Sequence, residues 1–205
     1  MAVLNNLSVP LGDSGESRGT LMPKLQYRFR VNFIGMGNGQ GNDATHNVIS
    51  VQRPNMSHDE VVVDTYNSKI YLAGKHSWEP ITIELRDDID SETSKLLDSQ
   101  VAKQIDMATQ SSSRAGASYK FAVTIENLNG GNPTTPDSVL DVWELSGCYI
   151  ANLTYNESNY SAGGEFQSIS VQIKFDNAAH LVGGVDALSG ASLSPNAASD
   201  SGATT

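Results

Sequence analysis

The stretch 66-YNSKIYLAGKHSWEPITIEL-85 decides the fold of this protein. It opens at a turn, Asn67-Ser68, and its first apolar run breaks at 73-AGK-75. From residue 81 to 86, apolar and polar residues alternate with a period of two, which indicates a half-buried strand. The stretch contains no paired acids, no nucleophile beside a base and no metal-ligand spacing. We interpret it as a long, aromatic-tipped hairpin that serves contact rather than catalysis.

Further strands are predicted on both sides of this hairpin. Gly147 lies inside the longest apolar run and predicts a β-bulge there. The loops at 35–47 and 127–139 are longer than a bare β fold needs. We therefore expect a mainly β protein, a β-sandwich or barrel, with strands over 25–33, 48–52, 60–66, 118–126, 139–155 and 165–175.

One amphipathic α-helix is predicted over residues 91–109. The acidic run 87-DDIDSE-92 comes at its start, where carboxylates suit the positive end of the helix dipole. We expect Asp90 or Ser91 to cap the helix. The run lacks the central glycine and the later glutamate of an EF-hand loop, so capping explains it better than calcium. The apolar stripe of the helix consists of Leu96, Leu97, Val101, Ile105 and Ala108.

The charge and the termini restrict the class of protein. The chain has 205 residues and a formal net charge of -10, and an acidic surface repels phosphate backbones, so groove-reading of nucleic acid is disfavoured. The N-terminus has no basic start and no continuous apolar core, and no apolar run reaches the length of a bilayer span. We expect a protein that is made in the cytoplasm and does not enter a membrane.

Catalytic and metal chemistry find no support in the sequence. The histidines are not at metal-ligand spacing from one another, and the single cysteine, Cys148, is expected to be a buried hydrophobe. No G-x-S-x-G elbow occurs. We predict that the protein is not an enzyme and takes no cofactor and no metal.

Three segments are expected along the chain. Residues 1–24 are polar and turn-rich and are predicted to be an N-terminal arm. Residues 25–176 are predicted to be the β-sandwich domain. Residues 177–205 contain no Lys or Arg and are dominated by Ala, Gly and Ser, so we predict a C-terminal extension that cannot form a core by itself.

The core of the chain resembles the tail tube proteins of long-tailed bacteriophages, especially those with contractile tails. The resemblance rests on 67-NSKIYLAG-74, on 78-WEPITIEL-85 before the acidic helix start, and on 149-YIANLTYNES-158 leading into 165-EFQSISVQIKF-175. It implies a protomer that assembles into a hexameric ring with a continuous luminal β-barrel. Stacked rings would form a tube that conducts the DNA genome during ejection.

The resemblance also implies roles for particular residues. The hairpin would reach the adjacent ring and stack on it through Tyr66, Asn67, Lys69, Ile70, Tyr71, Leu72, Gly74, Lys75 and Trp78. Acidic side chains would line a lumen that DNA passes without sticking, and the candidates are Glu84, Asp87, Asp88, Glu126, Asp141, Glu144, Glu157 and Glu165. Plain surface solubility is the other interpretation of this acidity.

The implied partners are six copies of the chain in a ring, the tail sheath, the baseplate, the tail terminator and the tape measure protein. The implied location is the tail of a virion, after synthesis in the host cytoplasm. Two alternatives stay open. The first is the tube protein of a type VI secretion system or another contractile injection system. The second is a carbohydrate-binding β-sandwich module, with Trp143, Tyr149, Tyr155 and Tyr160 as a sugar-stacking strip.

Overall fold

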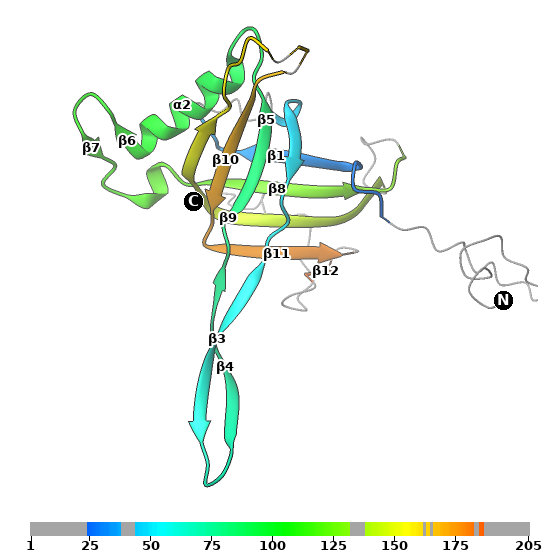
Figure 1. Ribbon diagram of the computed structural model, residues 1–205, viewed down its shortest axis with the longest axis vertical. Coiled ribbons are helices and arrows are strands. Elements are labelled where there is room, and N and C mark those ends of the chain that lie inside the picture. The colour runs from blue at the N-terminus through cyan, green and yellow to red at the C-terminus, as the bar shows by residue number, and fades with distance from the viewer. Residues whose placement is uncertain are drawn as a thin grey trace, which may run out of the picture.

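Two antiparallel sheets pack face to face and share one long strand in this computed structural model (Figure 1). The first sheet, sheet A, contains β1 (Phe29–Ile34), β8 (Phe121–Leu128), the first part of β9 (Val139–Tyr155), β11 (Asn177–Val182) and β12 (Val185–Asp186). The second sheet, sheet B, contains the rest of β9, β10 (Ser168–Lys174), β5 (Ile81–Arg86) and β2 (Val48–Val51). The structure describes residues 24–37, 44–131, 138–161, 163–164 and 166–182, and the backbone of 185–186.

Strand β9 joins the two sheets. Its first part, up to Cys148, pairs with β8, and its second part, from Tyr149, pairs with β10. Gly147 lies at the junction with φ +69°, a left-handed conformation that favours glycine, and the β8–β9 register shifts close to it. The predicted bulge at Gly147 is therefore confirmed. It is the bend that lets one strand serve both layers.

The core lies between the sheets and follows from their alternating patterns. In β5 and β8 every second side chain is buried and its neighbours are half-buried. Ile83, Val123 and Ile173 are completely buried. Because the side chains of a strand alternate between its two faces, these periods place one apolar face of each sheet inside. The predicted mainly β sandwich is confirmed.

Helix α2 (Glu92–Gln104) covers one end of the sandwich and is shorter than predicted. Leu96 and Leu97 are buried, as expected. The predicted continuation to residue 109 is wrong, because the chain turns into a short hairpin, β6 (Ile105–Asp106) and β7 (Ser111–Ser112), followed by the 3-10 helix η2 (Gly116–Ser118). Ala108 is consequently exposed rather than part of a buried stripe.

The cap of this helix also differs from the prediction. Ser91 occupies the N-cap position but makes no side-chain cap hydrogen bond. Asp88 accepts a hydrogen bond from the Glu92 backbone N–H at 2.8 Å, and Asp87 accepts one from the Ser94 hydroxyl at 2.9 Å. The acidic run therefore serves the helix start, as expected, through its first two carboxylates.

The ends of the predicted domain shift by a few residues. Residues 25–28 precede β1 in a turn, and Tyr27 is 71% exposed. Residues 177–182, which fall in the predicted C-terminal extension, form β11 and pair with β9, so that Ala178 joins the core. Residues 1–23 of the predicted arm, and 187–205 of the extension, lie outside the described part of the chain.

Candidate functional site

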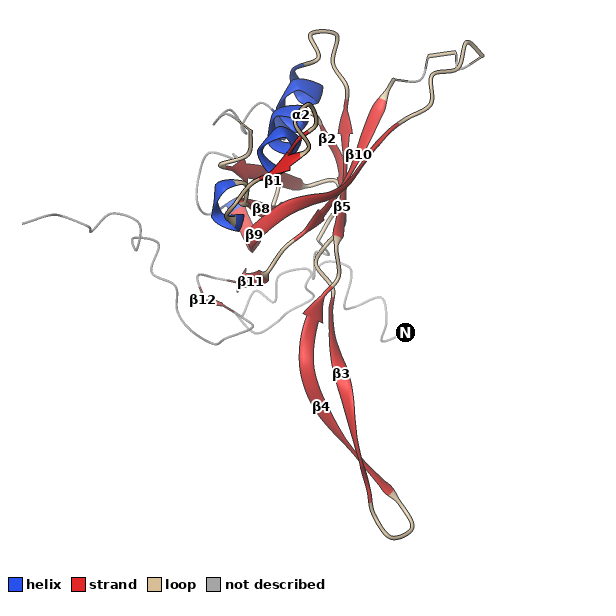
Figure 2. Cartoon of the chain, turned by 90° about the vertical axis from the view of Figure 1, so that its left-hand side faces the viewer, coloured by secondary structure: helices blue, strands red, loops and turns tan. Residues whose placement is uncertain are grey.

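The hairpin of β3 (Met56–Asp64) and β4 (Lys69–Trp78) projects away from the sandwich (Figures 1 and 2). It pairs with no other described strand. Every residue of β3 is exposed, and in β4 only Gly74 and Trp78 are half-buried. An isolated two-stranded hairpin is marginally stable in water, and an exposed apolar strand edge invites pairing. The hairpin is therefore the first candidate interface.

The pairing register divides the outer part of the hairpin into two faces. Val61 lies opposite Leu72 and Val63 opposite Ile70, so these four aliphatic side chains share one face. They are 42 to 52% exposed. Contiguous aliphatic side chains in water mark an interaction surface. We call this set the aliphatic face.

The opposite face is mixed. Val62 lies opposite Tyr71, which is 64% exposed, and Asp64 lies opposite Lys69. The Lys69 ammonium lies 3.9 Å from the Asp64 carboxylate, a solvent-exposed pair that contributes little to stability. This face offers an aromatic contact beside a charge pair.

The remaining residues of the predicted stacking device have separate positions. Tyr66 and Asn67 form the exposed tip. Gly74 and Lys75 lie where the β3–β4 register shifts, and a Cβ on Gly74 would come within 2.9 Å of the Asp59 carbonyl oxygen. Only a residue without a side chain fits there.

Trp78 does not belong to the exposed part of the hairpin. Its ring packs against Phe175, with centroids 5.6 Å apart, and it borders the hydrophobic core. His76 meets it edge-on, and His58 meets His76 in the same way. This row of rings anchors the base of the hairpin, so Trp78 supports the arm rather than contacting a partner with it.

The acidic residues predicted to line a lumen do not gather on one face. Glu84 lies half-buried on the outer side of sheet B, in register with Ser170 and Ser50. Asp87 and Asp88 follow β5 and are engaged at the start of α2. These three acids share one end of sheet B.

The other acidic candidates lie elsewhere. Glu126 faces outward from sheet A and pairs with Arg30 at 2.5 Å, and Glu144 is exposed on the same side. Glu157 lies in the exposed loop between β9 and β10. Glu165 lies outside the described residues.

Asp141 is buried and cannot belong to an exposed acidic lining. Its side chain points inward with Asn127, which donates a hydrogen bond to it. Lys24 pairs with it at 2.6 Å, and His180 lies 3.4 Å away. Burial alone would raise the pKa of this carboxyl, but the hydrogen bonds from Lys24, Asn127 and His180 and the charge of Lys24 outweigh that effect and lower it. Asp141 is in phase with the buried Leu145, so alternation along β9 is compatible with this inward position, but a lone acid in a strand was expected to face solvent.

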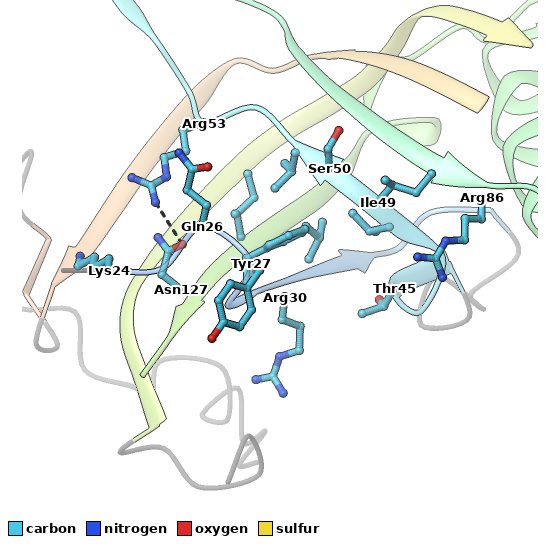
Figure 3. Close-up of a pocket in the computed structure, with 15 residues that line it drawn as sticks. Lys24, Gln26, Tyr27, Arg30, Thr45, Ile49, Ser50, Arg53, Arg86 and Asn127 are labelled. Atoms are coloured by element: carbon cyan, nitrogen blue, oxygen red, sulfur yellow. Dashed lines mark hydrogen bonds between the residues drawn. The ribbon is translucent and has the colours of Figure 1, made fainter. Parts of the chain in front are cut away.

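A second candidate interface lies between β1 and β2, a groove of about 1000 Å³ (Figure 3). Sequence reasoning did not identify it, because its walls come from segments far apart in the chain. Each of these two strands pairs with a described strand on one side only, so both sheet edges border the same groove. Its apolar lining comes from Phe29, Val31, Val48, Ile49, Val51 and Ile125.

Cations surround this groove. Lys24 and Arg30 line it, and both have carboxylate partners. Arg53 and Arg86 lie at its two ends (Figure 3). Arg53 makes a 3.4 Å hydrogen bond to Asn127, and Arg86 stacks over the Phe166 ring. Within the described residues, neither arginine has a carboxylate at ion-pair distance.

The aromatic residues of the proposed sugar strip are dispersed. Trp143 stacks on His180 with ring centroids 4.1 Å apart, and Tyr149 meets Tyr119 edge-on. The Tyr155 hydroxyl donates a hydrogen bond to Asp98 at 2.9 Å, and Tyr160 is fully exposed. They form no common platform for a sugar ring.

Metal and membrane features were sought in the described residues. No three His, Cys, Asp or Glu side chains of this part come together as metal ligands. Within the same residues, no helix combines the length and the apolarity required to cross a bilayer.

Comparisons with known proteins connect the fold to contractile particles. No protein-family model and no curated protein sequence matches this chain. A chain in the structure of the anti-feeding prophage tube-terminating cap is similar with a TM-score of 0.60 and 14% identity, over 84% of this chain and 99% of that one. A chain in the structure of the same particle's baseplate gives 0.57 and 12% identity, over 78% of this chain and 97% of that one.

A third similar chain comes from the sheath–tube complex of an extracellular contractile injection system in its extended state. The TM-score is 0.56 with 17% identity, and the match covers 79% of this chain and 93% of that one. At these identities the likeness shows a shared fold. The described sandwich therefore has the fold of chains found in contractile injection particles.

Proposed function

We propose that this protein is the structural tube subunit of a contractile tail or injection apparatus. In the phage form, which we favour, stacked hexameric rings enclose a lumen that conducts the DNA genome. The tube of a contractile injection system is the second form. The observation that carries the proposal is the projecting hairpin, whose aliphatic face is exposed and pairs with no other strand of the described residues, on a fold shared with contractile particles.

A second copy is the simplest partner for the hairpin. Four exposed aliphatic side chains in water are unfavourable, and their burial contributes roughly 25 cal/mol per Å² of apolar surface. A projecting arm that docks on a different surface of an identical copy makes a head-to-tail contact. Such contacts generate rings or open helical assemblies. A tube subunit uses this property without any catalytic group.

Sheet B is the surface we assign to the lumen. Its outer side carries rows of hydroxyl and amide side chains across the paired strands, with Glu84 as an acid among them. The exposed Arg86 and Lys174 lie at the ends of the same face, so the wall is polar but not acidic. Uncharged hydroxyl and amide side chains release no counterions, so they bind DNA phosphates only weakly. Asp87 and Asp88 would lie at one rim of this wall. The rows are Thr154–Ser170–Glu84–Ser50 and Asn152–Gln172–Thr82.

Within this proposal the protein acts without cofactor and without catalysis, as a component of the particle. Its partners would be further copies of itself, a sheath, a baseplate, a terminator and a tape measure protein. A neighbouring protomer would continue the wall of sheet B around the ring.

Negative-stain electron microscopy of concentrated protein tests the proposal. The wild-type chain is expected to form rings or hollow tubes. The double variant I70S/L72S makes the aliphatic face polar and is expected to remain a folded protomer. The matched control M107S/V182S changes two exposed apolar side chains outside the hairpin and should assemble normally. Tubes of unchanged yield from I70S/L72S would refute the role of the hairpin.

A further inference from the structure

The groove between β1 and β2 and the strand β3 match each other in charge and in apolar pattern. The groove has an apolar floor, with Arg53 at one end and Arg86 at the other (Figure 3). Strand β3 carries the run 59-DEVVVD-64, three valines with acids on both sides. All six residues of this run are exposed. Opposite charges on complementary surfaces select partners and set the register.

From this match we infer that the groove is the receptor for β3 of a second copy of this chain. The inference rests on the proposed tube function and adds the surface that receives the hairpin. Val61 and Val63, which share one face of β3, would lie over the apolar floor, and Val62 would point away from it. Asp59 at one end of the run would lie near one arginine of the groove, and Asp64 at the other end near the other, within reach of the long arginine side chains.

The lengths agree with this docking. Extended chain rises by about 3.3 Å per residue, so Asp59 and Asp64 are roughly 17 Å apart along β3. The Arg86 backbone N–H donates to the Asn47 carbonyl oxygen, which places Arg86 beside the start of β2. From residue 47 to Arg53 an extended chain covers roughly 20 Å. The acids and the arginines therefore have similar spacing.

Backbone pairing adds to the match. The groove is bordered by the unpaired edges of β1 and β2, and β3 has one unpaired edge of its own because it pairs with β4 alone among the described strands. An extended segment that joins a sheet edge gains main-chain hydrogen bonds in addition to side-chain contacts. The added strand would also cover the apolar floor that the described residues leave accessible.

The donor and the receptor belong to different copies. The hairpin tip points away from the body that contains β1 and β2 (Figures 1 and 2). Each copy thus offers a strand on one side and a groove on another. Contacts of this kind repeat from copy to copy, as the stacking of rings in a tube requires.

Charge reversal with complementation tests the inference. The groove variant R53E/R86E and the hairpin variant D59R/D64R should each need about tenfold more protein to assemble in sedimentation velocity, a change of about 1.4 kcal/mol. An equimolar mixture of the two should assemble again, because each reversed groove meets a reversed strand. The control R114E/K174E carries the same charge change as the groove variant, on exposed side chains outside the groove, and should behave as wild type.

The outcomes separate the inference from the proposed function. If the wild-type protein forms tubes and R53E/R86E forms them equally well, the docking inference is overturned and the tube function stands. If the protein associates head to tail without closed rings or tubes, and each variant weakens this association while the mixture restores it, the inference stands and the tube function is overturned. A chain that stays monomeric at every concentration would overturn both.

Discussion

The side-chain amide of Gln104 and the backbone of Ile150 exchange two hydrogen bonds. Gln104 Nε2 donates to the Ile150 carbonyl oxygen at 3.0 Å, and the Ile150 N–H donates to Gln104 Oε1 at 3.0 Å. The amide thus makes the two hydrogen bonds that the backbone of a neighbouring strand would make, on the edge of β9 opposite β10. Through this pair the last residue of α2 holds the helix to the sandwich.

Replacing Gln104 should therefore destabilise the protein. Q104L leaves the N–H and C=O of Ile150 without these partners, and an unsatisfied buried group costs about 1–3 kcal/mol. Q104E keeps an acceptor for the N–H but loses the donor, so it should lie between wild type and Q104L. Urea unfolding measures all three. Equal free energies of unfolding for Q104L and wild type would show that water replaces the pair without cost.

Tyr71 and Trp78 should respond differently to truncation, although both belong to the predicted stacking device. Tyr71 is exposed, so Y71A should leave the free energy of unfolding within about 0.5 kcal/mol of wild type and impair assembly. Trp78 packs on Phe175, and W78A should cost about 3 kcal/mol. Thermal or urea unfolding separates the two effects from assembly seen by microscopy. Equal destabilisation by both variants would contradict the assigned positions.

Asp141 should make stability depend on pH in the acid range. Its pKa in the folded protein lies below the usual value of 3.8, so its stabilising effect is present above that value and is lost as pH falls through the folded pKa. D141N should destabilise the protein at neutral pH by about 1.5–3 kcal/mol, because charged hydrogen bonds are lost. Unfolding curves of the two proteins should converge below about pH 4. A constant difference across this range would contradict the role of the charge.

Cys148 should be inert in the native protein. It is completely buried, and burial raises the pKa of its thiol to about 12. The thiolate is the reactive form, so a thiol reagent at pH 8 should label the native chain far more slowly than the same chain unfolded in urea. Comparable rates in the two states would mean that this part of the sandwich opens readily.

Gly147 should not tolerate a side chain. Its φ of +69° costs other residues about 1–2 kcal/mol, and a Cβ would come within 2.2 Å of the Asp176 carboxylate, which pairs with Lys120. G147A should therefore be less stable than wild type by at least this amount in urea unfolding. The control G163A lies in open surroundings and should have little effect.

Local pattern accounts for much of the fold. The alternation of Ile81, Ile83 and Leu85 and the long run 139–155 predicted β5 and β9, and the glycine in that run predicted the bulge. These features could be predicted because the alternation of buried and exposed side chains depends only on the residues of the strand itself. The end of the helix could not be predicted in this way. Ile105 continues the apolar spacing of the helix, but the chain has already turned into β6 at this residue.

The sequence by itself indicated a mainly β chain, and it contains no recognisable catalytic or metal motif. It predicted a hairpin over 66–85, whereas the structure pairs Met56–Asp64 with Lys69–Trp78 and places Ile81–Arg86 in sheet B. Only the tertiary structure decided where single side chains lie, because their neighbours come from distant segments. Trp78 is a core anchor through Phe175, and Asp141 is buried through Lys24 and His180. The groove between β1 and β2 exists only when two sheets have closed around β9, so no local pattern predicts it.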